Sequence, residues 1–196
     1  MSQVGWCLRR GVAWAPLLGC CAGALLLVAV LERWPGSALV LLPALVACCA
    51  GAAAFCFDEA ALPVVEVTPR GGTWRRRARL AVAGVPLLLW VVAVALRPGD
   101  LALSRGPWWL VGFAAIMLAA GVAALASRYA VAAPGGPLAA GVVLAVIGPV
   151  IVTAFLGWDT PYPVDDFGTE VVAFWSAVAA LAVLTCAAAL RPALRS

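Results

Sequence analysis

Long apolar runs separated by short polar interruptions form the main pattern of this chain. Six runs, at about residues 11–31, 37–57, 80–96, 107–126, 138–156 and 171–190, contain no charged side chain. A hydrocarbon core of about 30 Å needs about 20 apolar residues in a helix. The pattern therefore predicts an all-α integral membrane protein, with six transmembrane helices in a single domain that covers residues 1–196.

Proline, glycine and tryptophan predict local features of these helices. Pro43 is expected to bend the second run, and Gly148-Pro149 is expected to interrupt the fifth. The sequence Pro134-Gly135-Gly136-Pro137 has the composition of a turn. Trp108 and Trp109 begin the fourth run, where we expect an aromatic belt at the membrane surface.

Small residues are abundant inside the runs. Gly19 and Gly23 form a GxxxG pair, which favours close helix packing either within the chain or between two copies. The seven cysteines lie in or beside apolar runs and lack the spacing of a zinc site, so we interpret them as packing residues.

Composition supports the membrane assignment. Hydrophobic residues make up 65% of the chain and charged residues 11%, and the mean hydropathy is +1.07. A soluble domain carries about 25% charged residues. The net charge of +4 comes from arginines between apolar runs rather than from a basic face, so we expect no nucleic-acid partner.

Arginine distribution predicts the orientation of the chain. With both termini inside, ten arginines lie in interior segments and three (Arg33, Arg97 and Arg105) lie outside. This excess predicts cytoplasmic termini and a cytoplasmic 58–79 segment in the cell membrane of a bacterium. Residues 1–10 fit either a short amphipathic helix at the membrane surface or a frayed terminus.

The sequence lacks the residues that several kinds of chemistry require. The runs contain no ionisable side chain for a proton relay and no base beside a nucleophile, and the chain has no histidine. A chain without lysine cannot contain the phosphate-binding GxxxxGK[ST] sequence. We therefore predict no catalytic, cofactor-binding or metal-binding residue, and no enzyme activity on this chain.

The longest polar interruption is residues 58–79, which read DEAALPVVEVTPRGGTWRRRAR. Its arginines are explained by topology and by binding of anionic lipid headgroups. Its acidic and apolar first half is not explained in this way, because a connection needed only for topology could be much shorter.

The layout and this segment resemble the membrane subunits of ABC-2 type exporters, in their small bacterial form. The resemblance implies a permease subunit that exports an amphiphilic or hydrophobic cargo, with ATP and Mg²⁺ bound by a separate ABC-type ATPase. It implies a second copy or a homologous membrane subunit as a further partner. It also implies a coupling-type loop that contacts the ATPase through Asp58, Glu59, Leu62, Val65, Glu66 and Thr68, and a membrane-surface anchor of Trp74, Arg75, Arg76, Arg77 and Arg79.

The connection between the fifth and sixth runs departs from that family, since it is too short for a re-entrant helical pair. Its residues Trp158, Asp159, Tyr162, Asp165 and Asp166 form either a small extracellular lid or an ordinary acidic loop. Two other functions stay open. One is a structural or regulatory membrane subunit that transports nothing, and the other is an ion-coupled transporter without an ATPase.

Overall fold

The computed structural model describes residues 12–58, 72–95, 108–129, 134–162 and 168–191, and the side chains of 72–75 are outside this description. Most of the described residues are helical, and no strand occurs among them. The elements are α2 (Trp14–Arg33), η1 (Pro35–Ser37), α3 (Ala38–Phe55), α5 (Gly72–Val82), α6 (Gly84–Ala95), α7 (Trp108–Ala126), η3 (Ser127–Tyr129), α8 (Gly135–Leu156) and α9 (Thr169–Leu190).

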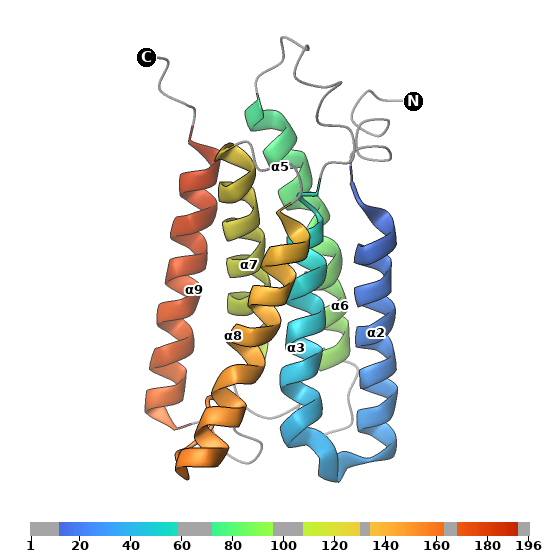
Figure 1. Ribbon diagram of the computed structural model, residues 1–196, viewed down its shortest axis with the longest axis vertical. Helices are drawn as coiled ribbons and strands as arrows, with labels where there is room; N and C mark the ends of the chain where they lie inside the picture. Colours follow the sequence, from blue (N-terminus) through green and yellow to red (C-terminus); the bar gives the residue numbers. More distant parts are fainter. Residues whose placement is uncertain (1–11, 59–71, 96–107, 130–133, 163–167, 192–196) are drawn as a thin grey trace.

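In the described part of the chain, six helical segments are long and apolar enough to cross a membrane, as the sequence predicted. They are Trp14–Arg33, Pro35–Phe55, Arg76–Ala95, Trp108–Tyr129, Gly135–Leu156 and Thr169–Leu190. The start of α2 and the end of α9 lie at the same end of the bundle (Figure 1). The amphipathic helix predicted for residues 1–10 falls outside the described residues.

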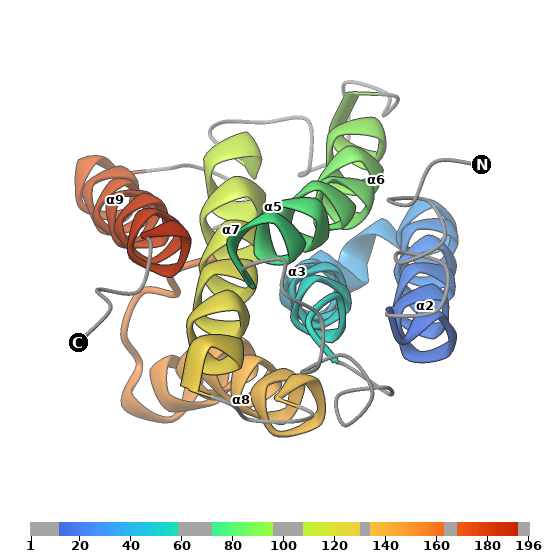
Figure 2. The same ribbon diagram turned by 90° about the horizontal axis from the view of Figure 1, so that it is seen from above.

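Helices α3 and α7 form the centre of the bundle. Helices α2, α6, α7 and α8 pack on α3, and α9 packs along α7 (Figure 2). Alanines at the contacts, such as Ala53 and Ala123, are fully buried. A Cβ added at Gly121 would lie 3.1 Å from the backbone nitrogen of Cys186, so α7 and α9 approach too closely there for a side chain.

The GxxxG pair packs partly within the chain. A Cβ added at Gly23 would lie 3.8 Å from Sγ of Cys48 on α3, whereas one added at Gly19 would meet nothing within 4 Å. Gly23 therefore faces α3. The cysteines described by the structure are free thiols, and Cys48 contributes to this interface.

The third span differs from its prediction. Helix begins at Gly72 rather than near residue 80, so the arginine-rich part of the 58–79 segment is helical. The span then breaks between α5 and α6 at Ala83. Pro86 explains the break, because it has no N–H to donate to the carbonyl of Val82.

Three expectations about proline are corrected or refined. Helix α8 runs through Pro149 without the predicted interruption, and α3 also continues through Pro43. Each proline removes one hydrogen bond, and membrane helices tolerate such a loss. The predicted turn at 134–137 is wrong, because α8 already begins at Gly135. Pro137 lies in the first helical turn, where no backbone N–H has an intrahelical acceptor.

Two arginine side chains donate hydrogen bonds to backbone carbonyls at or near the end of another helix. The Arg79 guanidinium donates a 3.0 Å hydrogen bond to the carbonyl of Phe57, just after α3. Similarly, Arg128 donates to the carbonyl of Ala188 in the last turn of α9 at 3.0 Å. The C-terminal end of a helix carries partial negative charge, so both cations interact favourably with the helix end that they approach.

Candidate functional site

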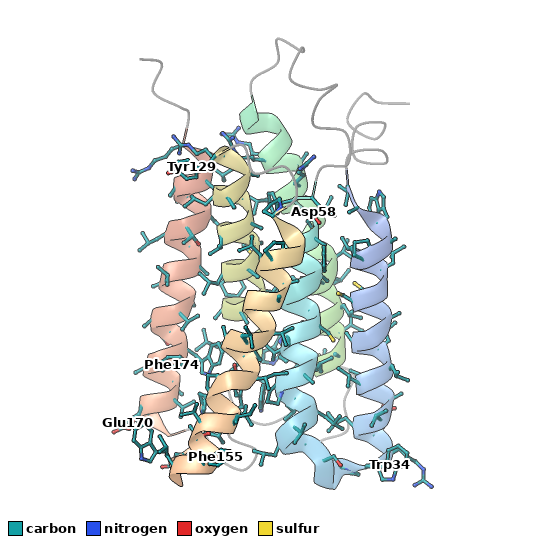
Figure 3. All side chains as sticks on the ribbon, viewed as in Figure 1. Trp34, Asp58, Tyr129, Phe155, Glu170 and Phe174 are labelled. Atoms are coloured by element: carbon teal, nitrogen blue, oxygen red, sulfur yellow. The ribbon has the colours of Figure 1, made fainter. Side chains whose placement is uncertain are left out.

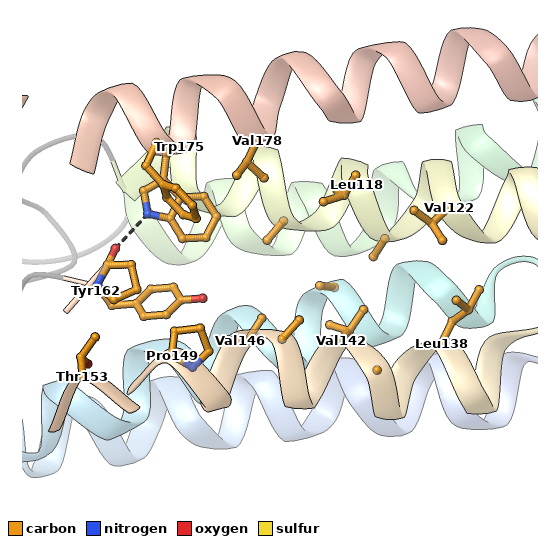
Figure 4. Close-up of a pocket in the computed structure, with 17 residues that line it drawn as sticks. Leu118, Val122, Leu138, Val142, Val146, Pro149, Thr153, Tyr162, Trp175 and Val178 are labelled. Atoms are coloured by element: carbon orange, nitrogen blue, oxygen red, sulfur yellow. Dashed lines mark hydrogen bonds between the residues drawn. The ribbon is translucent and has the colours of Figure 1, made fainter. Parts of the chain in front are cut away.

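A cleft of about 580 Å³ lies among α7, α8 and α9 (Figure 4), and Ala50 of α3 also lines it. One face of α8 supplies much of its wall, including Leu138, Val142, Val146 and Thr153. These residues recur at the three- and four-residue spacing that places side chains on one face of a helix. The volume falls in the range of small-molecule sites, about 300–1,000 Å³.

The cleft opens on the side of the bundle. Helix α8 packs on α3 and α9 packs on α7, while no appreciable packing joins α8 to α9. Lining residues on all three helices are exposed, among them Gly141 and Ala145 on α8, Val122 on α7 and Phe174 on α9. In a bilayer, this opening would face the hydrocarbon of the lipids.

Aromatic side chains close one end of the cleft. The ring of Tyr162 stacks on Trp108, with centroids 6.5 Å apart and planes 17° apart. It also packs against Trp175, at 5.4 Å. The indole N–H of Trp175 donates to the carbonyl of Pro161 at 2.8 Å, which holds the segment before Tyr162 against α9 (Figure 4).

Trp108 is therefore an interior residue, and its expected place in an aromatic belt is wrong. Its side chain is fully buried, whereas its neighbour Trp109 is 44% exposed. The reason is packing, because Trp108 lies between Tyr162 and Trp90, and the indole of Trp90 donates to the Trp108 carbonyl at 3.2 Å. Exposed aromatics at the bundle ends, such as Trp34 and Tyr129, are better placed for a membrane surface (Figure 3).

The polar atoms of the cleft lie at its aromatic end. Tyr162 is only 2% exposed, and its phenol points along the cleft between Trp175 and Pro149 (Figure 4). No partner for its hydroxyl is found among the described residues, and burial raises the pKa of this phenol. The hydroxyl of Thr153 donates to the carbonyl of Val150 at 3.2 Å and keeps its oxygen available as an acceptor.

The remaining wall is apolar. Its side chains carry no charge, and no cluster of metal-ligating residues occurs in the described part of the chain. The arrangement therefore offers a hydrocarbon-lined space with two hydroxyl groups at one end.

Of the predicted ATPase-contact residues, the structure places only Asp58. Its carboxylate accepts a short hydrogen bond from the backbone N–H of Gly135, the first residue of α8. A Cβ added at Gly135 would lie 2.6 Å from the Oδ1 atom of Asp58, so a larger residue there requires the carboxylate to move. The other predicted contact residues, Glu59, Leu62, Val65, Glu66 and Thr68, lie outside the described residues.

The predicted membrane-surface anchor is described in part. Arg79 is buried and bonds to the end of α3, Arg76 is half-buried and Arg77 is exposed. The side chains of Trp74 and Arg75 lie outside the described set. The anchor stays a prediction.

The predicted lid residues separate into two groups. Trp158 is 68% exposed and Asp159 is also exposed, both just beyond the end of α8. Tyr162 instead points inward and closes the cleft. Asp165 and Asp166 lie outside the described residues, so a lid function stays a prediction.

Sequence reasoning missed most of the cleft, including Trp175 and the lining face of α8. The apolar character of α8 extends around the whole helix, so no polar face indicates which side points inward. Gly141 and Ala145, four residues apart, are the one visible signal that a surface of small residues exists there.

The six long apolar helices among the described residues are compatible with a multi-pass membrane protein, and the apolar cleft opens on the side of their bundle. Comparisons with protein-family models, with curated proteins and with solved structures found no match. The resemblance to ABC-2 type subunits therefore depends on the sequence features alone.

Proposed function

We propose that this chain is the membrane-embedded subunit of an exporter and that the cleft among α7, α8 and α9 receives an amphiphilic or hydrophobic cargo from the bilayer. The observation that carries the proposal is the cleft, which combines an apolar wall with an opening between two helices. A cargo dissolved in the membrane could enter it sideways without crossing water.

The distribution of charge supports an orientation with the termini in the cytoplasm. Among the described residues, the end that holds Asp58 and Tyr129 also holds five arginines: Arg76, Arg77, Arg79, Arg128 and Arg191. The other end holds Glu32, Arg33, Asp159 and Glu170. The positive-inside tendency favours the arginine-rich end as the cytoplasmic one.

A separate ATPase is the proposed energy source, and this part rests on the sequence resemblance. One structural observation bears on how its motion would reach the cleft. Asp58 begins the segment proposed to contact the ATPase, and it bonds to the first residue of α8, whose inner face lines the cleft. A displacement of this segment would thus be transmitted directly to α8.

A steric block tests the cargo site. A Cβ added at Gly141 would meet nothing within 4 Å, so Gly141→Phe can fill the cleft without disturbing the helices. Gly148→Phe is the matched control, because Gly148 lies on the same helix in open space but does not line the cleft. The assay is labelling by a long-chain alkane that carries a photoreactive diazirine, in vesicles containing the protein.

We expect Gly141→Phe to abolish labelling of α7, α8 and α9 at the cleft and Gly148→Phe to leave it unchanged. Equal labelling of both variants would overturn the cargo site. Purification of the protein together with its surrounding membrane tests whether an ATPase is bound to it. A complex that contains no nucleotide-binding subunit would argue for the alternative, a structural or regulatory subunit that transports nothing.

A further inference from the structure

The hydroxyl of Tyr162 is a polar group that packing alone does not explain. The side chain is 2% exposed, its ring is held between two tryptophans, and its hydroxyl points into an apolar cleft. A phenylalanine would fill the same space without bringing a hydroxyl into it. The hydroxyl faces the open space of the cleft, so a ligand that offers it a hydrogen-bond partner there would gain affinity.

A second hydroxyl lies at the same end of the cleft. Thr153 lines the wall one turn from Pro149, and its oxygen can accept a hydrogen bond while its proton is donated to Val150. Pro149 adds a further polar feature, because it has no N–H to pair with the carbonyl of Ala145, which also lines the cleft. Figure 4 shows Thr153, Pro149 and Tyr162 together at this end.

The shape of the cleft limits the apolar part of the ligand. Its wall on α8 extends from Leu138 to Thr153, which is about 22 Å along a helix. The cleft is therefore elongated along α8, a shape that suits a hydrocarbon chain lying parallel to the helix. The length exceeds one leaflet of a hydrocarbon core about 30 Å thick.

The polar end of the cleft lies where a lipid headgroup would lie. Thr153 precedes the end of α8 at Leu156 by one turn, and Tyr162 belongs to the segment that follows. Phe155, close to both in the sequence, lies at the end of the bundle opposite Asp58 (Figure 3), and in a bilayer this end would lie near the membrane surface. A ligand lying along the cleft would have its polar group near the surface and its chain in the hydrocarbon.

From these observations we infer that the cleft binds a membrane amphiphile with a hydrocarbon chain and an uncharged hydroxyl or carbonyl head, and that Tyr162 and Thr153 recognise this head. An uncharged head is specified because no charged side chain lines the cleft. The inference rests on the proposed function, since it names the class of cargo for the same site.

A matched pair of probes tests the inference. One is a long-chain alcohol with a diazirine in its chain, and the other is the same molecule with a methyl group in place of the hydroxyl. In vesicles containing the wild-type protein, we expect half-maximal labelling at about 3- to 10-fold lower concentration of the alcohol, which corresponds to one net hydrogen bond.

Tyr162→Phe should remove most of this preference, because it keeps the ring and deletes only the hydroxyl. Thr153→Val should reduce it, and Gly148→Phe should not change it. Unfolding curves of the variants show whether each remains folded, and the conservative Thr153→Val variant tests the site independently if Tyr162→Phe is unstable.

The outcomes separate this inference from the proposed function. If both probes label the cleft equally and Gly141→Phe blocks this labelling, the cargo site stands and the recognition of a polar head is overturned. Absence of cleft labelling by either probe would overturn both. Cross-links between two copies through the cleft, with no probe bound, would overturn both in favour of a protein interface.

Discussion

The contact between Asp58 and Gly135 makes a quantitative prediction about the start of α8. Gly135→Ala would place a methyl group 2.6 Å from Oδ1 and 2.7 Å from Cγ of Asp58. The carboxylate must then move, and the backbone N–H of residue 135 loses its acceptor. A hydrogen bond to a charged group contributes about 1.5–3 kcal/mol, and loss of a helix cap costs about 0.5–2 kcal/mol.

Because Asp58 is only half-buried, we expect the lower part of these ranges. Gly135→Ala and Asp58→Ala should each destabilise the protein by about 1–2 kcal/mol. The two losses share one cause, so the double variant should be no less stable than Asp58→Ala alone. The expected coupling energy is about 1–2 kcal/mol, above the 0.3–0.5 kcal/mol within which independent sites add.

Unfolding by sodium dodecyl sulfate in mixed micelles, followed by circular dichroism, measures these free energies. Gly136→Ala is the control, because a Cβ added at Gly136 meets nothing within 4 Å, although it lies in the same helical turn. Strict additivity of Asp58→Ala and Gly135→Ala, or an equal loss in Gly136→Ala, would refute the assignment of Asp58 as the cap of α8.

Three further predictions concern other buried groups. Arg79→Met should cost about 1–3 kcal/mol in the same unfolding assay, since it removes the hydrogen bond to the carbonyl of the buried residue Phe57; an unchanged curve would contradict this. Gly112→Ala should cost a similar amount, because its methyl group would overlap the indole of Trp90, and Trp90→Phe should recover part of the loss. In a Tyr129→Phe variant the remaining phenol is Tyr162, whose burial raises its pKa, so its ultraviolet titration should occur well above pH 10, about the usual value for tyrosine. The folded state then binds the extra proton, so stability should fall as pH rises beyond about 10, and a titration at the usual pH would show that Tyr162 is not buried.

The number and approximate limits of the spans could be predicted from the sequence, because a helix needs about 20 consecutive apolar residues to cross a bilayer. Because the helices are apolar on all sides, their sequences do not indicate which face of each helix contacts its neighbours. Nothing in the sequence of α8 distinguishes Val142, which lines the cleft, from Leu144, which is 73% exposed. The cleft follows from tertiary packing and was therefore not predictable.

Local composition failed where a distant residue decides the structure. Pro134-Gly135-Gly136-Pro137 reads as a turn, yet Gly135 starts α8 because a carboxylate 77 positions earlier accepts its N–H. Likewise, Trp108 follows the pattern of a surface belt, but its aromatic partners come from α6 and from the segment before α9. Both outcomes depend on contacts between segments far apart in the sequence.

The cross-helix caps also have a consequence for the biogenesis of the protein. The N–H of Gly135 pairs with Asp58, and the last turn of α9 pairs with Arg128, so each capping residue is synthesised before the helix that it completes. The carbonyl of Phe57, just after α3, is the exception, because its donor Arg79 is synthesised later. We therefore expect α3 to become fixed only after the third span has been inserted, and α8 and α9 then to dock as they leave the ribosome onto sites already in place.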